Sequence, residues 1–140
     1  MDLSDRLATV LGEILPLTRE DDGAITVHHD ETFASLRVVE IAEGLELVSL
    51  TQILAWDLPL DAKLRATVAD HAHNTLLGTV SLAAKSGHKE IAAGAKRNSK
   101  KVADVLLRYN FPAAGLTDDA LRTLILMVLS TGSDVRRDLV

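Results

Sequence analysis

The segment that most constrains the fold is a long apolar run at residues 45–56. Side chains at successive positions of a strand point to opposite faces of the sheet. Apolar residues at both sets of alternate positions therefore predict a strand that is covered on both faces. The two sets are occupied by Leu45, Leu47 and Ile53 and by Val48, Leu50 and Leu54. We therefore expect a central strand here, joined to a preceding strand at residues 33–42 by a short Gly44-containing hairpin connection.

The other elements follow from hydrophobic periodicity and from turn residues. Apolar residues recur at helical spacing in residues 4–15, with Ser4 as the expected N-cap, in residues 60–74, and after Thr117. Strand-like patterns occupy residues 25–30, 76–84 and 102–111. We expect the last helix to run close to the C-terminus, with Gly132 as a point where it can end early. The order α-β-β-β-α-β-β-α predicts an α+β fold, an antiparallel sheet of about five strands with helices packed against it.

Length and composition limit the class of protein. A chain of 140 residues is the usual size of one domain, so residues 1–140 are expected to form a single α+β domain. No apolar stretch approaches the length of a membrane helix, and acidic residues precede the first apolar positions at the N-terminus. The absence of cysteine excludes disulfides and thiolate chemistry and fits a reducing compartment. We expect a cytoplasmic protein that does not enter a membrane.

The sequence contains no pattern that indicates catalysis or a cofactor. His28 and His29 are adjacent on a strand and point to opposite faces, and His71 and His73 diverge on a helix, so neither pair suits a metal ion. No nucleophile elbow and no phosphate-binding loop is present. Aromatic residues make up 3% of the chain, which disfavours a pocket for a flat cofactor. We expect a protein that is not an enzyme, with no catalytic residue, no metal ligand and no cofactor.

The strongest charge feature is the segment of residues 85–101, which we call the basic segment. It carries six basic residues against the single acid Glu90, while the rest of the chain has 9 basic and 19 acidic residues. The basic segment is either a solvated loop or a contact for an acidic partner, such as nucleic acid, or for the acidic face of a second subunit. Its candidate contact residues are Lys96, Arg97, Lys100 and Lys101.

Apolar stripes on the predicted helices and strands are a second class of candidate surface. Such stripes are ordinary core in most proteins, but excess apolar area can dock a partner segment or a second subunit. The candidate partner contacts are Leu50, Leu54, Val68, Ile125 and Leu129.

The element order resembles that of the YbjN-like family, which shares its fold with the type III secretion chaperones. The resemblance covers nearly the whole chain, and its local matches lie in the C-terminal half. They are Gly78-Thr79-Val80-Ser81-Leu82, Leu106-Leu107-Arg108-Tyr109 and Gly115-Leu116-Thr117-Asp118-Asp119-Ala120-Leu121. The resemblance implies a small non-enzymatic domain, often dimeric, that binds a partner polypeptide on a helix or sheet surface.

Two functional hypotheses follow from the sequence. The first is a chaperone-like or adaptor domain, expected to be a homodimer, that captures a segment of another protein through the apolar candidates. The alternative is a binder of nucleic acid or another acidic ligand that acts through the basic segment.

Overall fold

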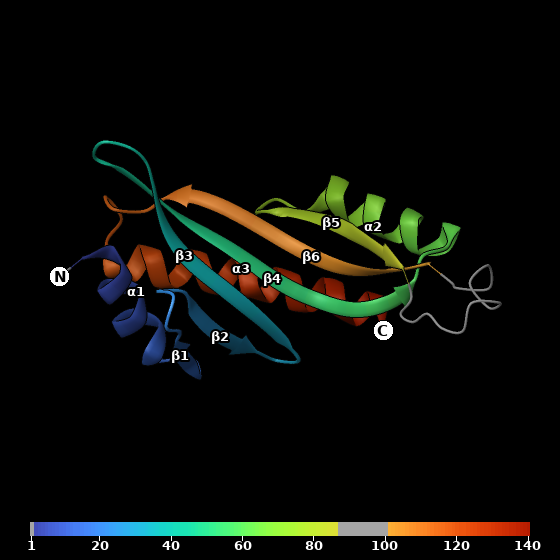
Figure 1. Ribbon diagram of the computed structural model, residues 1–140, viewed down its shortest axis with the longest axis horizontal. Helices are drawn as coiled ribbons and strands as arrows, with labels where there is room; N and C mark the ends of the chain where they lie inside the picture. The colour runs from blue at the N-terminus through green and yellow to red at the C-terminus, as the bar shows by residue number, and fades with distance from the viewer. Residues whose placement is uncertain (1, 87–100) are drawn as a thin grey trace.

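The computed structural model describes residues 2–86 and 101–140 and shows an α+β fold with a strongly curved antiparallel sheet (Figure 1). The sheet has six strands in the order β1-β2-β3-β4-β6-β5, and every neighbouring pair is antiparallel. The strands are β1 (Leu17–Arg19), β2 (Ile25–His29), β3 (Thr32–Ala42), β4 (Leu45–Pro59), β5 (Thr79–Ser86) and β6 (Lys101–Pro112). The predicted fold class is confirmed, with one short strand, β1, added to the expected sheet.

Three helices accompany the sheet: α1 (Leu3–Gly12), α2 (Ala62–Asn74) and α3 (Asp118–Leu139). Each begins at a side chain that accepts a hydrogen bond from the first turn, namely Asp2, Asp61 and Thr117. Asp2 therefore takes the capping role expected for Ser4. In Figure 1, α3 runs behind the sheet, and α2 lies alongside β5.

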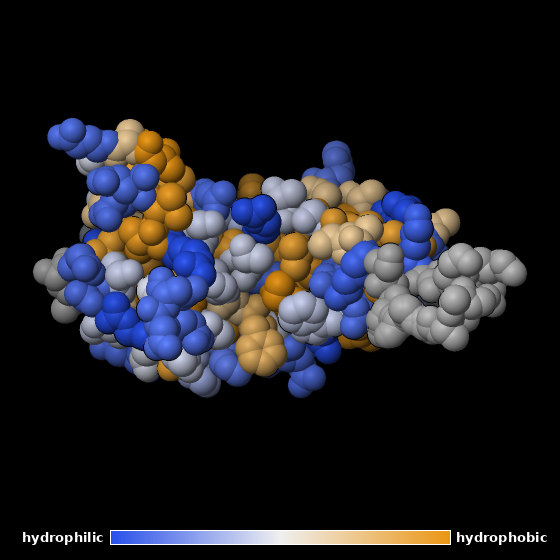
Figure 2. Space-filling view, viewed as in Figure 1, coloured by the Kyte–Doolittle hydropathy of each residue, from blue (hydrophilic) through white to orange (hydrophobic). Residues whose placement is uncertain are grey.

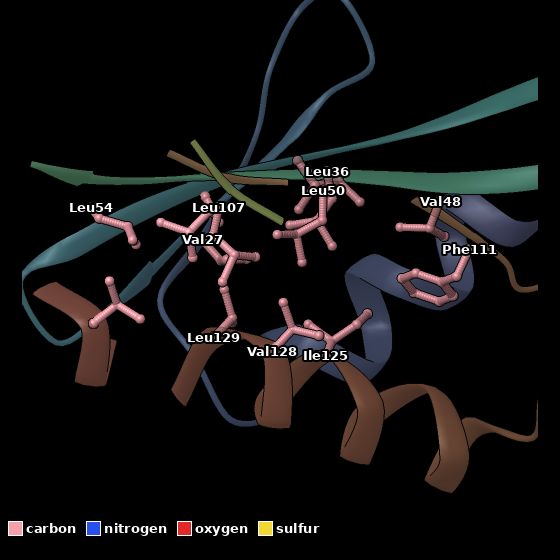
Figure 3. Close-up of a cluster of buried hydrophobic side chains, with 14 of the residues drawn as sticks. Val27, Leu36, Val48, Leu50, Leu54, Leu107, Phe111, Ile125, Val128 and Leu129 are labelled. Carbon is pink, nitrogen blue, oxygen red and sulfur yellow. The ribbon is translucent and has the colours of Figure 1, made fainter. Parts of the chain in front are cut away.

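The core lies between one face of the sheet, the inner face, and the helices. In Figure 3, Leu36, Leu50 and Leu107 project from the sheet toward Ile125 and Leu129 of α3. These side chains are almost completely excluded from solvent, and α2 contributes Leu64 and Val68 to the same core.

Strand β4 has neighbours on both sides, as expected of an interior strand. The prediction that both of its faces are covered is wrong for the described residues. Val48, Leu50 and Leu54 are buried under α3, whereas Leu47 and Ile53 on the other face are only half-buried. No described helix lies over this second face, which we call the open face (Figure 1).

Helix α3 does not end at Gly132 but continues to Leu139, and the glycine has a packing role instead. A Cβ atom built on Gly132 would lie 1.9 Å from Oε1 of Gln52, a buried side chain of β4. Because glycine has no side chain, α3 can approach the sheet closely at this point. This close packing outweighs the low helix propensity of glycine.

Candidate functional site

The five apolar residues predicted to contact a partner are all buried. Leu50, Leu54, Ile125 and Leu129 have no exposed surface, and Val68 is 5% exposed. They belong to one buried cluster in the core and cannot contact a partner in this fold. The prediction is corrected accordingly: these positions are ordinary core, and any contact surface has to be found among exposed side chains.

Most of the predicted basic contact residues lie outside the described residues, namely Lys96, Arg97 and Lys100. Lys101 is exposed at the start of β6. At the other end of the basic segment, the Lys85 ammonium lies 2.8 Å from Asp104 and 2.7 Å from Asp57. Hydrogen bonds to Asp104 and then to Asp57 raise the pKa of Lys85 above its ordinary value, so its charge is balanced within the fold.

The open face is organised in rows that cross the strands. Phe33 of β3 pairs with Ile53 of β4, and Ile53 pairs with Leu106 of β6, which together form the apolar row. Phe33 is 46% exposed and stacks edge-on against His28 of β2, with ring centroids 4.4 Å apart. Figure 2 shows hydrophobic residues in the middle of this face between hydrophilic ones.

One side of the apolar row is acidic and carries the exposed tryptophan of the chain. Trp56 is 57% exposed, and the Lys85 ammonium lies 5.6 Å from the centre of its ring. The backbone N–H of Asp57 donates a hydrogen bond to Asp104, which fixes this end of β4 against β6. We call Trp56, Asp57, Lys85 and Asp104 the acidic corner, because its two carboxylates outnumber its one cation.

The other side of the apolar row is basic and rich in hydroxyl groups. The next row along the strands contains Ser35, Thr51, Arg108 and Thr79. Arg108 is exposed and makes no ion pair with another described residue. It borders an open hollow of about 560 Å³ over β5 and β6, whose other lining residues include Gly78, Ser81 and Asn110.

The β3–β4 hairpin, residues 37–47, projects beyond the rest of the sheet and is the second exposed surface (Figure 1). Strand β2 pairs with β3 only from Thr32 to Leu36, so Arg37 and the residues up to Ala42 pair with β4 alone. Their other backbone edge has no partner strand among the described residues. In Figure 2 hydrophobic residues follow one side of the hairpin and hydrophilic residues the other, and Val39, Ile41 and Leu45 are 41%, 57% and 41% exposed.

The hairpin is acidic as well as apolar. Glu40 and Glu43 are exposed, Glu46 is half-buried, and the one basic residue, Arg37, is engaged by Asp22 at 2.5 Å. A free strand edge with exposed apolar side chains is the geometry used to bind an extended peptide by strand addition. The sequence pattern predicts strands at these residues but not the free edge, because strand pairing beyond a hairpin cannot be read from local periodicity.

The potential metal ligands of the described residues do not gather in one place. No group of three or more potential metal ligands occurs among residues 2–86 and 101–140. His29 shares a hydrogen bond of 2.7 Å with Ser133, and His71 shares one of 2.7 Å with Asp138, so both histidines link α3 to the rest of the fold. Among the described helices, none combines the length and hydropathy of a membrane span.

These features define a small α+β domain in which helices cover one face of an antiparallel sheet and leave the other open. The fold is YbjN-like: the crystal structure of YbjN from E. coli, a proposed transcription regulator, superposes with a TM-score of 0.58. The likeness covers 94% of this chain and 87% of that one at 12% sequence identity, so it concerns the fold. No protein-family model matches the sequence. No curated protein matches it either.

Proposed function

We propose that this chain is a non-enzymatic, cytoplasmic protein-binding domain of the adaptor or chaperone-like kind, and that it captures an extended segment of a partner polypeptide on β3. The observation that carries the proposal is the edge of β3 at residues 37–42, which has no partner strand among the described residues, projects beyond β2 and bears exposed apolar side chains. A partner strand added there continues the sheet where β2 ends.

The chemistry of the hairpin selects the partner. Val39 and Ile41 supply apolar contacts on the open-face side of β3, while the hairpin carries three glutamates against one ion-paired arginine. Like charges on paired strands repel, and opposite charges attract. The captured segment is therefore extended, apolar at alternate positions and basic between them.

The test uses a synthetic peptide of alternating valine and lysine, labelled with a fluorophore, and a control peptide of alternating proline and lysine that cannot pair as a strand. Anisotropy is expected to rise with the first peptide only. Hydrogen exchange is expected to slow at alternate backbone amides of residues 37–42, because strand addition gives these N–H groups acceptors.

Two variants locate the binding. Replacing Val39 and Ile41 together by threonine keeps strand propensity but removes apolar contact, and we expect at least a roughly tenfold loss of affinity. Leu76→Thr is the matched control, because Leu76 is 90% exposed and lies away from the hairpin. Equal binding by wild type and the double variant, or protection outside β3, would contradict the proposal.

The alternative function, binding of nucleic acid, is favoured by two exposed cations and by the basic segment. Lys101 and Arg108 are both exposed on β6, and the related fold of YbjN belongs to a proposed transcription regulator. This function predicts binding of a single-stranded oligonucleotide that weakens steeply as salt rises. Reversal of the charge at Lys96, Arg97, Lys100 and Lys101 should abolish it, and unchanged binding would exclude this role for the basic segment.

A further inference from the structure

The open face is complementary to itself about the apolar row. On β6, the outward-facing residues Asp104, Leu106 and Arg108 follow one another at alternate positions. Leu106 lies in the apolar row, Asp104 lies two residues away in the acidic corner, and Arg108 lies two residues away on the opposite side. A carboxylate and a guanidinium are thus placed at equal distances, about 7 Å, on either side of an apolar centre.

We propose that two copies of this chain associate through their open faces, related by a two-fold axis that runs along the apolar row. This rotation places each strand over the same strand of the second chain, with the two strands running in opposite directions. Phe33, Ile53 and Leu106 then meet the same residues of the second copy. Arg108 meets the acidic corner of the other chain, and the acidic corner meets the other chain's Arg108.

The same axis places the projecting Trp56 of one chain opposite the hollow beside Arg108 of the other. Trp56 stands out from the acidic corner with its ring over Lys85, on the β5 side of β4. Its symmetry-related position is the hollow beside Arg108 that Thr79, Ser81 and Asn110 help to line. Each copy therefore inserts its Trp56 into the hollow of the other, where Arg108 can lie against the indole ring as well as face the carboxylates.

The dimensions of the face indicate a dimer of modest strength. The axis through Leu106 superposes equal lengths of strand on its two sides, so β6 contributes from Asp104 to Arg108. At about 3.3 Å per residue, and with four strands at about 4.8 Å spacing, this gives roughly 300 Å² of plane for each copy. The two copies together bury roughly 600 Å², which is the size of a weak, transient interface. Dimerisation should therefore depend on concentration within the range of sedimentation experiments. This interface is separate from strand addition at the hairpin.

Trp56 provides the first test, because it is the one tryptophan in the chain. Sedimentation velocity over a concentration series should show a dimer, and over the same series the tryptophan emission should shift to the blue and become less accessible to acrylamide. A monomer at every concentration would overturn the proposal. A dimer in which Trp56 remains as accessible as in the monomer would also overturn it.

Charge reversal provides the second test. Arg108→Glu and Asp57→Lys each place like charges at both symmetric contacts, so each variant alone should be monomeric. Mixed together they should form a heterodimer, because the new carboxylate of the Arg108→Glu chain then faces the reversed acidic corner of the other chain. Arg65→Glu on the exposed surface of α2 makes the same charge change away from the face and should dimerise like wild type.

Circular dichroism melts confirm that each variant is folded before it is mixed. The paired threonine replacements at Val39 and Ile41 should leave the dimer intact, which separates this proposal from binding at the hairpin. Dimerisation by both charge variants alone, or no heterodimer from two folded variants, would show that the open face is not the interface.

Discussion

The two faces of the sheet differ in what covers them, although the sequence of the central strand is apolar on both. The inner face meets α3, α1 and α2, and most of its leucines and valines are buried. The open face has no helix from the described part of the chain, and its apolar residues alternate with hydroxyl groups and charges. Apolar residues at alternate positions therefore show which faces of a strand can become core, while the packing of the helices decides which face does.

The largest expected difference between the faces lies in truncations on β4. Leu50→Ala leaves a cavity in the fully buried core and should lower the free energy of unfolding by about 3 kcal/mol. Ile53→Ala, on the half-buried open face, should cost about 1 kcal/mol, because solvent already reaches the site. Urea denaturation of the two variants measures both values. Equal losses would mean that the open face is as well packed as the inner one.

The contact between α3 and the inner face gives the next largest effect. Gly132→Ala should cost about 2 kcal/mol, because the new methyl group meets Gln52 Oε1 and displaces a side chain whose Nε2 donates to Thr32 and to the Leu129 carbonyl. Gly12→Ala in α1 is the control, since a Cβ there meets nothing within 4 Å and alanine favours the helix.

A double variant checks the cause of this loss. Gln52→Ala removes the atom that the new methyl group would meet, so Gly132→Ala should cost less in that background than in wild type. The free energies of unfolding of the four proteins in the cycle give the coupling. Additive losses would show that Gly132 matters for a reason other than the close approach of Gln52.

The smallest effect concerns an ion pair at the edge of the open face. The pKa of Asp22 lies below its ordinary value, first because the Arg37 guanidinium bonds to it and also because the Ala24 backbone N–H donates to it. Its contribution to stability is present above the unfolded-state value of 3.8 and is lost as the pH falls through the lower folded-state pKa.

Asp22→Asn tests this pair, because asparagine keeps an oxygen for the Ala24 N–H but loses the charge. Thermal melts of wild type and variant should differ slightly at neutral pH and converge as the pH falls well below 3.8. A difference of constant size over this range would assign the effect to something other than the ionised carboxyl. The packing of the inner face, whose described core cluster is apolar, should be insensitive to the same change of pH.

Periodicity determined most of the elements, because helix and strand repeats and their capping residues are local properties. The strand-rich middle, the three helices and the antiparallel α+β class were predicted from Leu, Ile and Val spacing and from the turn at Gly44. Strand β1 was missed because Leu17–Arg19 is too short to show a period. Capping by Asp2 instead of Ser4 lies within the ordinary uncertainty of helix ends.

The tertiary structure decided which apolar residues are available for binding. The buried and the exposed candidates are all apolar, so residue type alone could not separate core from surface. The buried residues are Leu50, Leu54, Val68, Ile125 and Leu129, and the exposed ones are Phe33, Val39 and Ile41. The separation depends on long-range contacts: α3 packs on one face of β4, β2 ends at the middle of β3, and Gln52 fits against Gly132. The sequence by itself determined the elements and their order, whereas only the packing of distant segments determined the open face and the free edge, because burial is a property of the whole fold.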